Sequence, residues 1–490
     1  MSSQEIQDYI DDHSFDSRPF AAAANDPTEP PNLPPEEGRG DHFQPFNIED
    51  RNFQINPLPQ QPLELFQRFI PISLVRSWVG YTEDWASFCA LNGVIDSWNT
   101  PLSDHSRLNA WEGISIAQAY VWLGILIYLG IHREISLEEH WKAPSLGDQR
   151  PLYPFTKFMP LQKFELITRY FRTFDHTNLD VSDEKDLPKT FQAAEEWSEH
   201  IQRVSIELYL PGTNLTVDEC MVPFTGRSKE TTLAKGKPTP MGFKVWVIAQ
   251  QGYFLQWLWH VKASPVTAIT VKLEAPTPYG KKGKLRTEIP LSNTQSVVVH
   301  LLKRLTTATY HVFTHNLFSS PQLFRLLRQL GHGATGTARP NCGITTVMKQ
   351  IKETGKKPDG MPLVYNKVYL IPTKDKQLCG PLPYNCAWRS PSQPHTKKEE
   401  VARQKRHKGR GTTPKEVFNG DQASIIPIPS VAAQYNDEMN HVDRGDQIRS
   451  YTSYQHRFRR GPWQALLWSF LLGVALANSF ILQKKTRQPR

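Results

Sequence analysis

Cysteine is scarce in this chain, which has only five among its 490 residues. The five are scattered and no two form a CxxC pair, so the sequence excludes a disulfide framework and gives no support for a zinc site. The N-terminal stretch MSSQEIQDYIDDHSF is acidic and lacks the apolar core of a secretory signal peptide. These absences favour a reducing compartment over a secreted protein.

Long hydrophobic runs are also rare, and a single one approaches the length of a membrane span. It covers Ala465 to Leu482 and contains three polar residues, Ser469, Asn478 and Ser479. Because of these polar residues, and because the run lies in a basic chain, we expect a buried core helix and no membrane partner. The alternative, a membrane-attached protein, depends on this segment alone.

Acidic residues are outnumbered, with 48 Asp and Glu against 57 Lys and Arg, which gives a net charge of +9. A basic surplus favours a polyanionic partner such as DNA, because each neutralised phosphate releases condensed counterions. Charge alone leaves open a basic protein without such a partner. The hydrophobic content of 39% is enough for sizeable globular cores.

The first two hundred residues change in character near residue 63. Residues 1–62 are acidic and rich in proline, a composition that predicts a disordered arm. From residue 63 to 210 the pattern is helical. Ser115 to Ile131 is mostly apolar, and Leu161 to Phe171 has apolar residues at i, i+3 and i+4 spacing. We expect an all-helical unit here.

The pattern then turns to alternating strands and helices. A short strand at 214–217 leads into Asp218, and two strands follow that are separated only by Gln251-Gly252, the length of a tight hairpin turn. The predicted elements are strands 243–250 and 253–261, a helix at 294–307, a strand at 310–314, a helix at 321–330 and a strand at 334–338. This order predicts an α/β fold with a mixed sheet, the chain order of the ribonuclease-H-like fold.

Three aspartates suit metal-dependent phosphoryl transfer, in which two divalent ions are held by carboxylates. Asp218 stands at the end of the first strand. Asp443 and Asp446 lie three residues apart on a predicted helix that resumes at Gln434, so they share one face. The fold also needs a carboxylate just after the strand at 310–314, and there the residue is His315.

Three strings in the chain resemble the motifs of the piggyBac family of DNA transposases. VDECMVPFTGR, which contains Asp218, is similar to the first acidic motif. HNLFSS is similar to the Asp-Asn-(Trp/Leu/Phe)-Phe-(Thr/Ser)-Ser motif, with His315 where the aspartate belongs. HVDRGDQIRSY is similar to the Val-Asp-x-x-Asp-Gln motif, and an apolar helix follows it. The resemblance runs from about residue 63 to the end and is strongest to fungal members.

The resemblance implies a nuclear cut-and-paste transposase that acts on transposon ends and TTAA targets as a homodimer. It implies Mg²⁺ or Mn²⁺ as cofactor, with Asp218, Asp443 and Asp446 as ligands. The implied organisation is a helical dimerisation and DNA-binding domain in two parts, 63–210 and 447–490, a catalytic core at 211–342 and 431–446, and an insertion at 343–430 with a basic loop. Residues 447–490 contain no cysteine, so we expect no zinc from a cysteine-rich module of the kind that some members carry.

The histidine at position 315, where the family motif has an aspartate, is unfavourable for metal-dependent catalysis. A neutral imidazole carries no negative charge and suits zinc or copper better than magnesium. No Asp or Glu lies between Glu288 and Lys352, so no nearby acid replaces the missing one. We expect transposition to be impaired, with manganese binding by His315 as the rescue alternative. A second alternative is a non-catalytic, transposon-derived DNA-binding protein.

Basic residues near the motifs are the candidates for contacts with the DNA backbone. They flank the first motif and precede the last helix, and they are Lys235, Lys237, Lys244, Arg457, Arg459 and Arg460. The alternative for the arginines is helix capping and packing, and each residue alone is a weak signal.

Overall fold

A computed structural model gives the fold of the chain. It describes residues 48–94, 101–143, 151–178, 189–226, 228–234, 239–262, 268–279, 284–339, 350–351, 353–357, 359–361, 369–372, 377–382, 387–390, 400–406, 423–451 and 463–487. Most of the predicted N-terminal arm, residues 1–47, lies outside the described residues.

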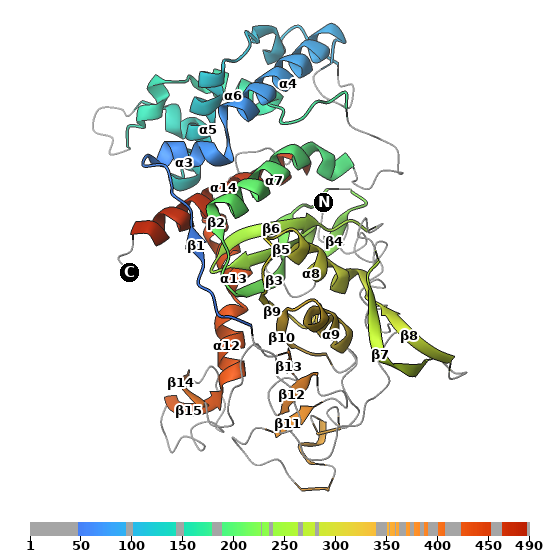
Figure 1. Cartoon of the computed structure of the whole chain (residues 1–490). Coiled ribbons are helices and arrows are strands. Elements are labelled where there is room, and N and C mark those ends of the chain that lie inside the picture. Colours follow the sequence, from blue (N-terminus) through green and yellow to red (C-terminus); the bar gives the residue numbers. More distant parts are fainter. Residues whose placement is uncertain are drawn as a thin grey trace.

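A helical unit forms one end of the molecule (Figure 1). Its helices are α3 (Pro62–Phe69), α4 (Ile72–Leu91), α5 (Ile116–Ile131) and α6 (Leu161–Tyr170). Helix α5 begins at a capping box, in which the side chains of Ser115 and Gln118 each bond to the other's backbone N–H. The helices predicted at 115–131 and 161–171 are therefore confirmed.

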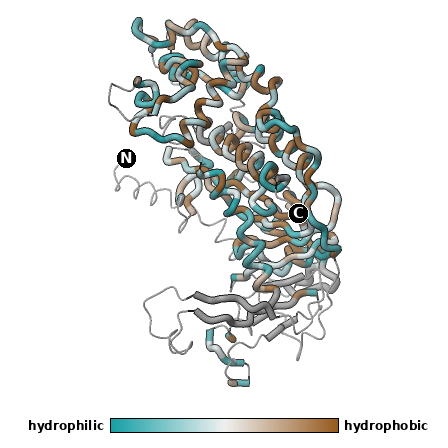
Figure 2. Tube along the Cα trace, turned by 90° about the vertical axis from the view of Figure 1, so that its left-hand side faces the viewer, coloured by the Kyte–Doolittle hydropathy of each residue, from teal (hydrophilic) through white to brown (hydrophobic). Residues whose placement is uncertain are grey.

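Tryptophans join the helical unit to two long helices, α7 (Lys189–Leu208) and α14 (Trp463–Arg487). Trp78 and Trp197 meet edge to face with ring centroids 5.0 Å apart. Trp468 of α14 lies 5.6 Å from Trp122 and 5.7 Å from Trp197. Such aromatic packing buries large areas and fixes the relative position of the helices. Figure 2 shows hydrophobic residues recurring along these helices.

A nine-stranded mixed sheet forms the middle of the molecule, in the order β11-β12-β13-β10-β9-β3-β5-β4, with β6 also paired to β5. Its central strands are β3 (Asn214–Pro223), β5 (Met241–Gln250), β6 (Tyr253–Trp259), β9 (His311–Thr314) and β10 (Gly333–Thr337). β3 pairs antiparallel with β5 and parallel with β9, which pairs parallel with β10. The prediction of a mixed sheet is confirmed.

The β5–β6 hairpin and the helices of the core follow the predicted order. Gln251 and Gly252 both have positive φ, 51° and 90°, as the predicted two-residue turn requires. The two core helices are α8 (Asn293–Lys303) and α9 (Pro321–Gln329). Helix α8 ends earlier than predicted, because Arg304 is its C-cap and its backbone N–H bonds to the carbonyls of Leu301 and Leu302.

Several strands were absent from the prediction. β4 (Thr231–Leu233), β11 (Tyr369–Pro372), β12 (Cys379–Leu382) and β13 (Ala387–Ser390) extend the main sheet, and β13 pairs antiparallel with β10. The sheet therefore continues beyond residue 342, where the sequence predicted an insertion to begin. Three two-stranded sheets stand apart from it: β1 (Gln54–Ile55) with β2 (Tyr209–Leu210), β7 (Thr270–Tyr279) with β8 (Lys284–Pro290), and β14 (Glu400–Arg406) with β15 (Ala423–Pro429).

The helix predicted from Gln434 is divided in two, α12 (Ser430–Glu438) and α13 (His441–Ser450). Asn440 interrupts it, with a φ of −81° and a ψ of 6° that lie outside the helical region. α13 carries both predicted acidic residues and packs on β3, β5 and α14.

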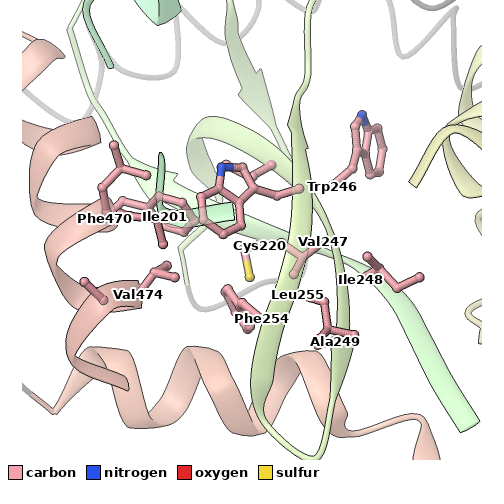
Figure 3. Packing of buried hydrophobic residues seen from close by; sticks show 14 of the residues in the cluster. Ile201, Cys220, Trp246, Val247, Ile248, Ala249, Phe254, Leu255, Phe470 and Val474 are labelled. Atoms are coloured by element: carbon pink, nitrogen blue, oxygen red, sulfur yellow. The ribbon is translucent and has the colours of Figure 1, made fainter. Parts of the chain in front are cut away.

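Helices α7 and α14 cover strand β6, which among the described strands pairs only with β5. Figure 3 shows Phe470 and Val474 of α14 and Ile201 of α7 facing the strands that carry Cys220 and Phe254. The predicted apolar helix at 465–482 is thus present. Within the described residues, α14 alone is long and apolar enough to cross a membrane, and 67% of its apolar window is buried inside the protein. That burial suits a core helix.

Polar side chains of the same two helices bond to the free edge of β6. Asn478 accepts a hydrogen bond from the backbone N–H of Phe254 (3.0 Å) and donates to its carbonyl (2.9 Å). Gln202 of α7 accepts from the N–H of Trp257 at 2.9 Å. The two amides satisfy backbone groups that another strand would otherwise satisfy. Asn478, the polar break in the apolar run, therefore has a structural partner.

Candidate functional site

Asp218 and His315 lie at corresponding positions on adjacent parallel strands. The register of β3 and β9 pairs Val217 with Thr314, and the two candidate residues come next along each strand. Asp218 is half-buried, and its Oδ1 accepts a hydrogen bond from the backbone N–H of Glu219 at 2.8 Å. His315 is exposed. The histidine therefore occupies the place beside Asp218 that the sequence predicted for the second carboxylate.

The turn that carries His315 is held by its own hydrogen bonds. The carbonyl of His315 accepts from the N–H groups of Phe318 (3.1 Å) and Ser319 (3.3 Å). The Ser319 hydroxyl lies 2.9 Å from that of Thr314, and the Ser320 side chain caps α9 by accepting from Leu323 N–H. None of these bonds uses the imidazole. The shape of the turn therefore depends in large part on backbone and hydroxyl groups that do not change with the residue at position 315.

Two further contacts fix the surroundings of this turn. The buried ring of Phe318 packs edge to face on Trp246 of β5, with centroids 5.4 Å apart. Arg339, just after β10, donates to the Asn316 side-chain oxygen from two nitrogens at 3.3 Å each. Asn316, Phe318, Ser319 and Ser320 of the HNLFSS motif thus have packing or hydrogen-bonding roles that depend on the fold.

Tyr435 of α12 is a neighbour of Asp218 that sequence reasoning missed. Its hydroxyl lies 3.3 Å from that of Thr337 on β10. Burial raises the pKa of Tyr435, and the negative charge of Asp218 raises it further. The hydrogen bond with Thr337 acts in the opposite direction and lowers this pKa. Its position eight residues before Asp443 has no motif that would have revealed it.

The two aspartates of α13 differ from Asp218 in their surroundings. Asp443 is exposed, whereas its neighbour Val442 is fully buried against the sheet. Asp446 forms an ion pair with Arg449 one turn later, in which Asp446 Oδ1 accepts from Nε at 3.1 Å and also from a terminal guanidinium nitrogen. One predicted metal ligand is thus already bound to a cation of the chain.

The described side chains do not fit a bound metal pair in this arrangement. Within the described part of the chain, no three His, Cys, Asp or Glu side chains come together closely enough to hold a metal ion. The donor set has a histidine at the second position and an aspartate that is engaged by Arg449. The set Asp218, Asp443 and Asp446 remains a prediction from the sequence.

Lys244, predicted to contact DNA, is buried instead, with 5% of its surface exposed. Its ammonium lies 4.9 Å from the centroid of the Trp246 ring, a cation–π contact within the core. Burial, followed by the charges of Lys244 and Lys262, lowers the pKa of neighbouring His260 to about 4. The strand pattern placed Lys244 on β5 but could not show what covers that face, and its contact with DNA remains a prediction.

The other candidate DNA contacts cannot be placed in the same way. They lie outside the described residues, and they are Lys235, Lys237, Arg457, Arg459 and Arg460. Their assignment remains a prediction from the sequence.

The fold and the site together define a class. The central strand β3 carries Asp218 and lies between the antiparallel strand β5 and the parallel strand β9. His315 follows β9, and the later helix α13 carries two aspartates. This is the arrangement of a transposase core of the ribonuclease-H-like type. A family model described as "Transposase IS4" matches residues 61–480, most of the chain. The chain belongs to the piggyBac transposase family.

Relatives and a solved structure agree with this assignment. The human PiggyBac transposable element-derived protein 2 is 24% identical over 330 residues, which cover 66% of this chain and 48% of that protein. The human PiggyBac transposable element-derived protein 3 is 24% identical over 335 residues, with the same two shares. This chain thus spans about half the length of the curated relatives it matches.

The solved structure is a piggyBac transposase synaptic complex with hairpin DNA. The match has a TM-score of 0.61 and 18% identity, and it covers 90% of this chain and 80% of that chain. At that identity the likeness shows the fold, which confirms the predicted ribonuclease-H-like class. Transposases of this family generally use divalent metals.

Proposed function

We propose that this chain is a piggyBac-type, transposable-element-derived protein that binds DNA and whose ancestral cut-and-paste reaction at TTAA sites is impaired by His315. The main support for the proposal is the register of β3 and β9. Val217 pairs with Thr314, so the residues that follow them, Asp218 and His315, lie next to each other. A second-position carboxylate is missing there, and no acid occurs between Glu288 and Lys352 to replace it.

DNA as a partner is supported by two independent features. The chain carries a net charge of +9, and the piggyBac transposase whose fold it shares was solved as a synaptic complex with hairpin DNA. Phosphate contacts make such binding strongly salt-dependent. Recognition of transposon ends, homodimer formation and a nuclear location belong to the proposal as well. Light scattering of the purified chain and imaging of a tagged copy test the last two.

The test compares DNA binding and DNA cleavage in the wild-type chain and in His315→Asp. The substrate is duplex DNA with matching transposon ends flanked by TTAA, in the presence of Mg²⁺ or Mn²⁺. We expect both proteins to bind with similar affinity and His315→Asp to cleave at least about tenfold faster, because a second carboxylate strengthens metal binding. His105→Asp, which adds a carboxylate at an exposed loop residue, is the matched control.

Each outcome bears on the proposal. If the wild type cleaves as fast as His315→Asp, His315 does not impair the reaction and the proposal is wrong. If both proteins bind DNA and neither cleaves, the second candidate function, a non-catalytic DNA-binding protein, is favoured. If the wild type shows no salt-sensitive DNA binding, both candidates are excluded.

A further inference from the structure

The Arg449 side chain pairs with the Asp446 carboxylate on its own helix and packs against Phe470 and Gly473 of α14. Two nitrogens of its guanidinium donate to Asp446 Oδ1, the Nε at 3.1 Å. The guanidinium carbon lies 4.9 Å from the centroid of the Phe470 ring on α14. A Cβ added at Gly473, also on α14, would lie 2.4 Å from Arg449 Cγ and 3.1 Å from Cδ, so the absence of a side chain there leaves room for the arginine.

This ion pair differs from the ordinary surface pairs of the molecule. Lys142 and Glu139 also pair at i, i+3 spacing, but 55% of the lysine side chain is exposed. Only 14% of the Arg449 side chain is exposed. An exposed pair is weakened by solvent and by side-chain entropy, whereas a packed arginine has lost that freedom already. Arg449 is therefore a fixed partner for Asp446.

We propose that Arg449 is a built-in counter-ion that keeps Asp446 from binding a divalent metal ion. The inference rests on the proposed function and deepens it, because it assigns a second obstacle to metal binding beside His315. A metal ion would have to displace a charge-assisted hydrogen bond from two nitrogens before it could use the carboxylate. Magnesium, which loses its water ligands reluctantly, is poorly suited to that exchange.

A consequence follows for DNA binding. Arg449 balances the negative charge of Asp446. Of the two aspartates on α13, the exposed Asp443 is then the one whose charge a metal ion would still have to balance. Because one carboxylate of the pair already has a counter-ion in the chain, we expect DNA binding to depend less on divalent metal than it would if both carboxylates needed a metal ion.

The experiment measures Mn²⁺ affinity by isothermal titration calorimetry in the full chain, on the His315→Asp background, which restores the carboxylate of the second position. Arg449→Met removes the charge and keeps much of the side-chain length. Gly473→Ala leaves the charge in place but adds a Cβ where Arg449 now packs. We expect each added substitution to tighten Mn²⁺ binding by about tenfold over His315→Asp alone, and Arg449→Lys to fall between.

Two matched controls separate this effect from general ones. Arg444→Met removes an exposed positive charge from the same helix, and Gly124→Ala adds a methyl group in helix α5, where no atom lies within 4 Å. Both should change Mn²⁺ affinity by less than about twofold on the same background. Circular dichroism identifies any variant that fails to fold, and Gly473→Ala and Arg449→Lys then decide the question without Arg449→Met.

The inference and the proposed function fail in different ways. If neither Arg449→Met nor Gly473→Ala tightens Mn²⁺ binding beyond the controls, Arg449 does not keep Asp446 from metal, whatever the DNA result. If the wild type binds DNA tightly only when Mg²⁺ or Mn²⁺ is added, the expectation of a weak metal dependence is wrong. Absence of DNA binding in EDTA and in metal alike would instead overturn the proposed function and leave the Mn²⁺ comparison standing.

Discussion

The outer strand β6 and the adjoining ends of β3 and β9 belong to one sheet but differ in how tightly their residues are held. At β6, the Asn478 side chain makes hydrogen bonds to both backbone groups of Phe254 and to the Ser205 hydroxyl, in a site with 1% of the asparagine surface exposed. At the end of β9, His315 is exposed, and its backbone carbonyl accepts hydrogen bonds from the N–H groups of Phe318 and Ser319.

The difference explains how the family fold can persist with an altered site. A residue such as Asn478 cannot change without leaving buried backbone groups unsatisfied, so the folded state depends on it. A residue such as His315 lies at the surface, where a substitution usually costs little folding free energy. The sheet therefore retains the architecture of a transposase independently of whether the acidic site can bind metal.

The largest effect is expected from Asn478→Leu at the β6 side of the comparison. Leucine has a similar volume but leaves the N–H and carbonyl of Phe254 without partners, which should lower the free energy of unfolding by about 3–5 kcal/mol. Urea denaturation monitored by tryptophan fluorescence measures this loss. Ser479→Ala, which removes a helical i−4 hydrogen bond to Ala475, should cost less than about 1 kcal/mol. Equal effects of the two substitutions would refute the special role of Asn478.

A smaller loss is expected from Gly336→Val, which tests the turn at the His315 side. A Cβ at Gly336 would lie 2.2 Å from Ser319 Oγ and 2.7 Å from the Thr314 backbone oxygen. The strand must shift to accept it, so the free energy of unfolding should fall by about 2–3 kcal/mol. Thermal or urea unfolding of Gly336→Val against Gly124→Ala, which adds a methyl group in open space, checks the prediction. An unchanged stability would mean that the turn is less rigid than its contacts indicate.

The smallest effect concerns Glu438, whose carboxylate lies at the junction of α12 and α13. Burial chiefly, and then the charges of Asp437 and Asp50, raise the pKa of Glu438 from 4.5 to about 7, against a lowering influence from Arg444. A raised pKa contributes stability that is fully present below pH 4.5 and is lost as the pH rises through about 7. Allowing for solvent screening, Glu438→Gln should be more stable than wild type by about 1 kcal/mol at pH 8.

The pH dependence supplies the decisive comparison for Glu438. The advantage of Glu438→Gln should disappear at pH 4, where the wild-type carboxyl is protonated. Glu112→Gln, at an exposed position, controls for the loss of one negative charge. A gain at pH 8 that persists unchanged at pH 4 would show that the substitution acts through packing and not through ionisation.

Much of the fold followed from local patterns. The alternating residues of β5 and β6 with Gln251-Gly252 between them predicted a hairpin, and the apolar spacing predicted α5 and α6. These patterns are reliable because each element buries one face at a fixed period. The strands β11, β12 and β13 escaped prediction. β13 joins the sheet by pairing with β10, about fifty positions earlier in the chain, and β11 and β12 reach the sheet only through β13, so the local sequence pattern could not place them.

The sequence by itself determined the family, the order of the central strands and helices, and the histidine at the second acidic position, since each is a property of residue identity and local spacing. Only the tertiary structure decided that Lys244 is buried, that the Tyr435 hydroxyl meets that of Thr337 and that Arg449 pairs with Asp446 while packing on α14. The physical reason is that the surroundings of these side chains come from distant segments, and burial, pKa and ion pairing depend on those surroundings.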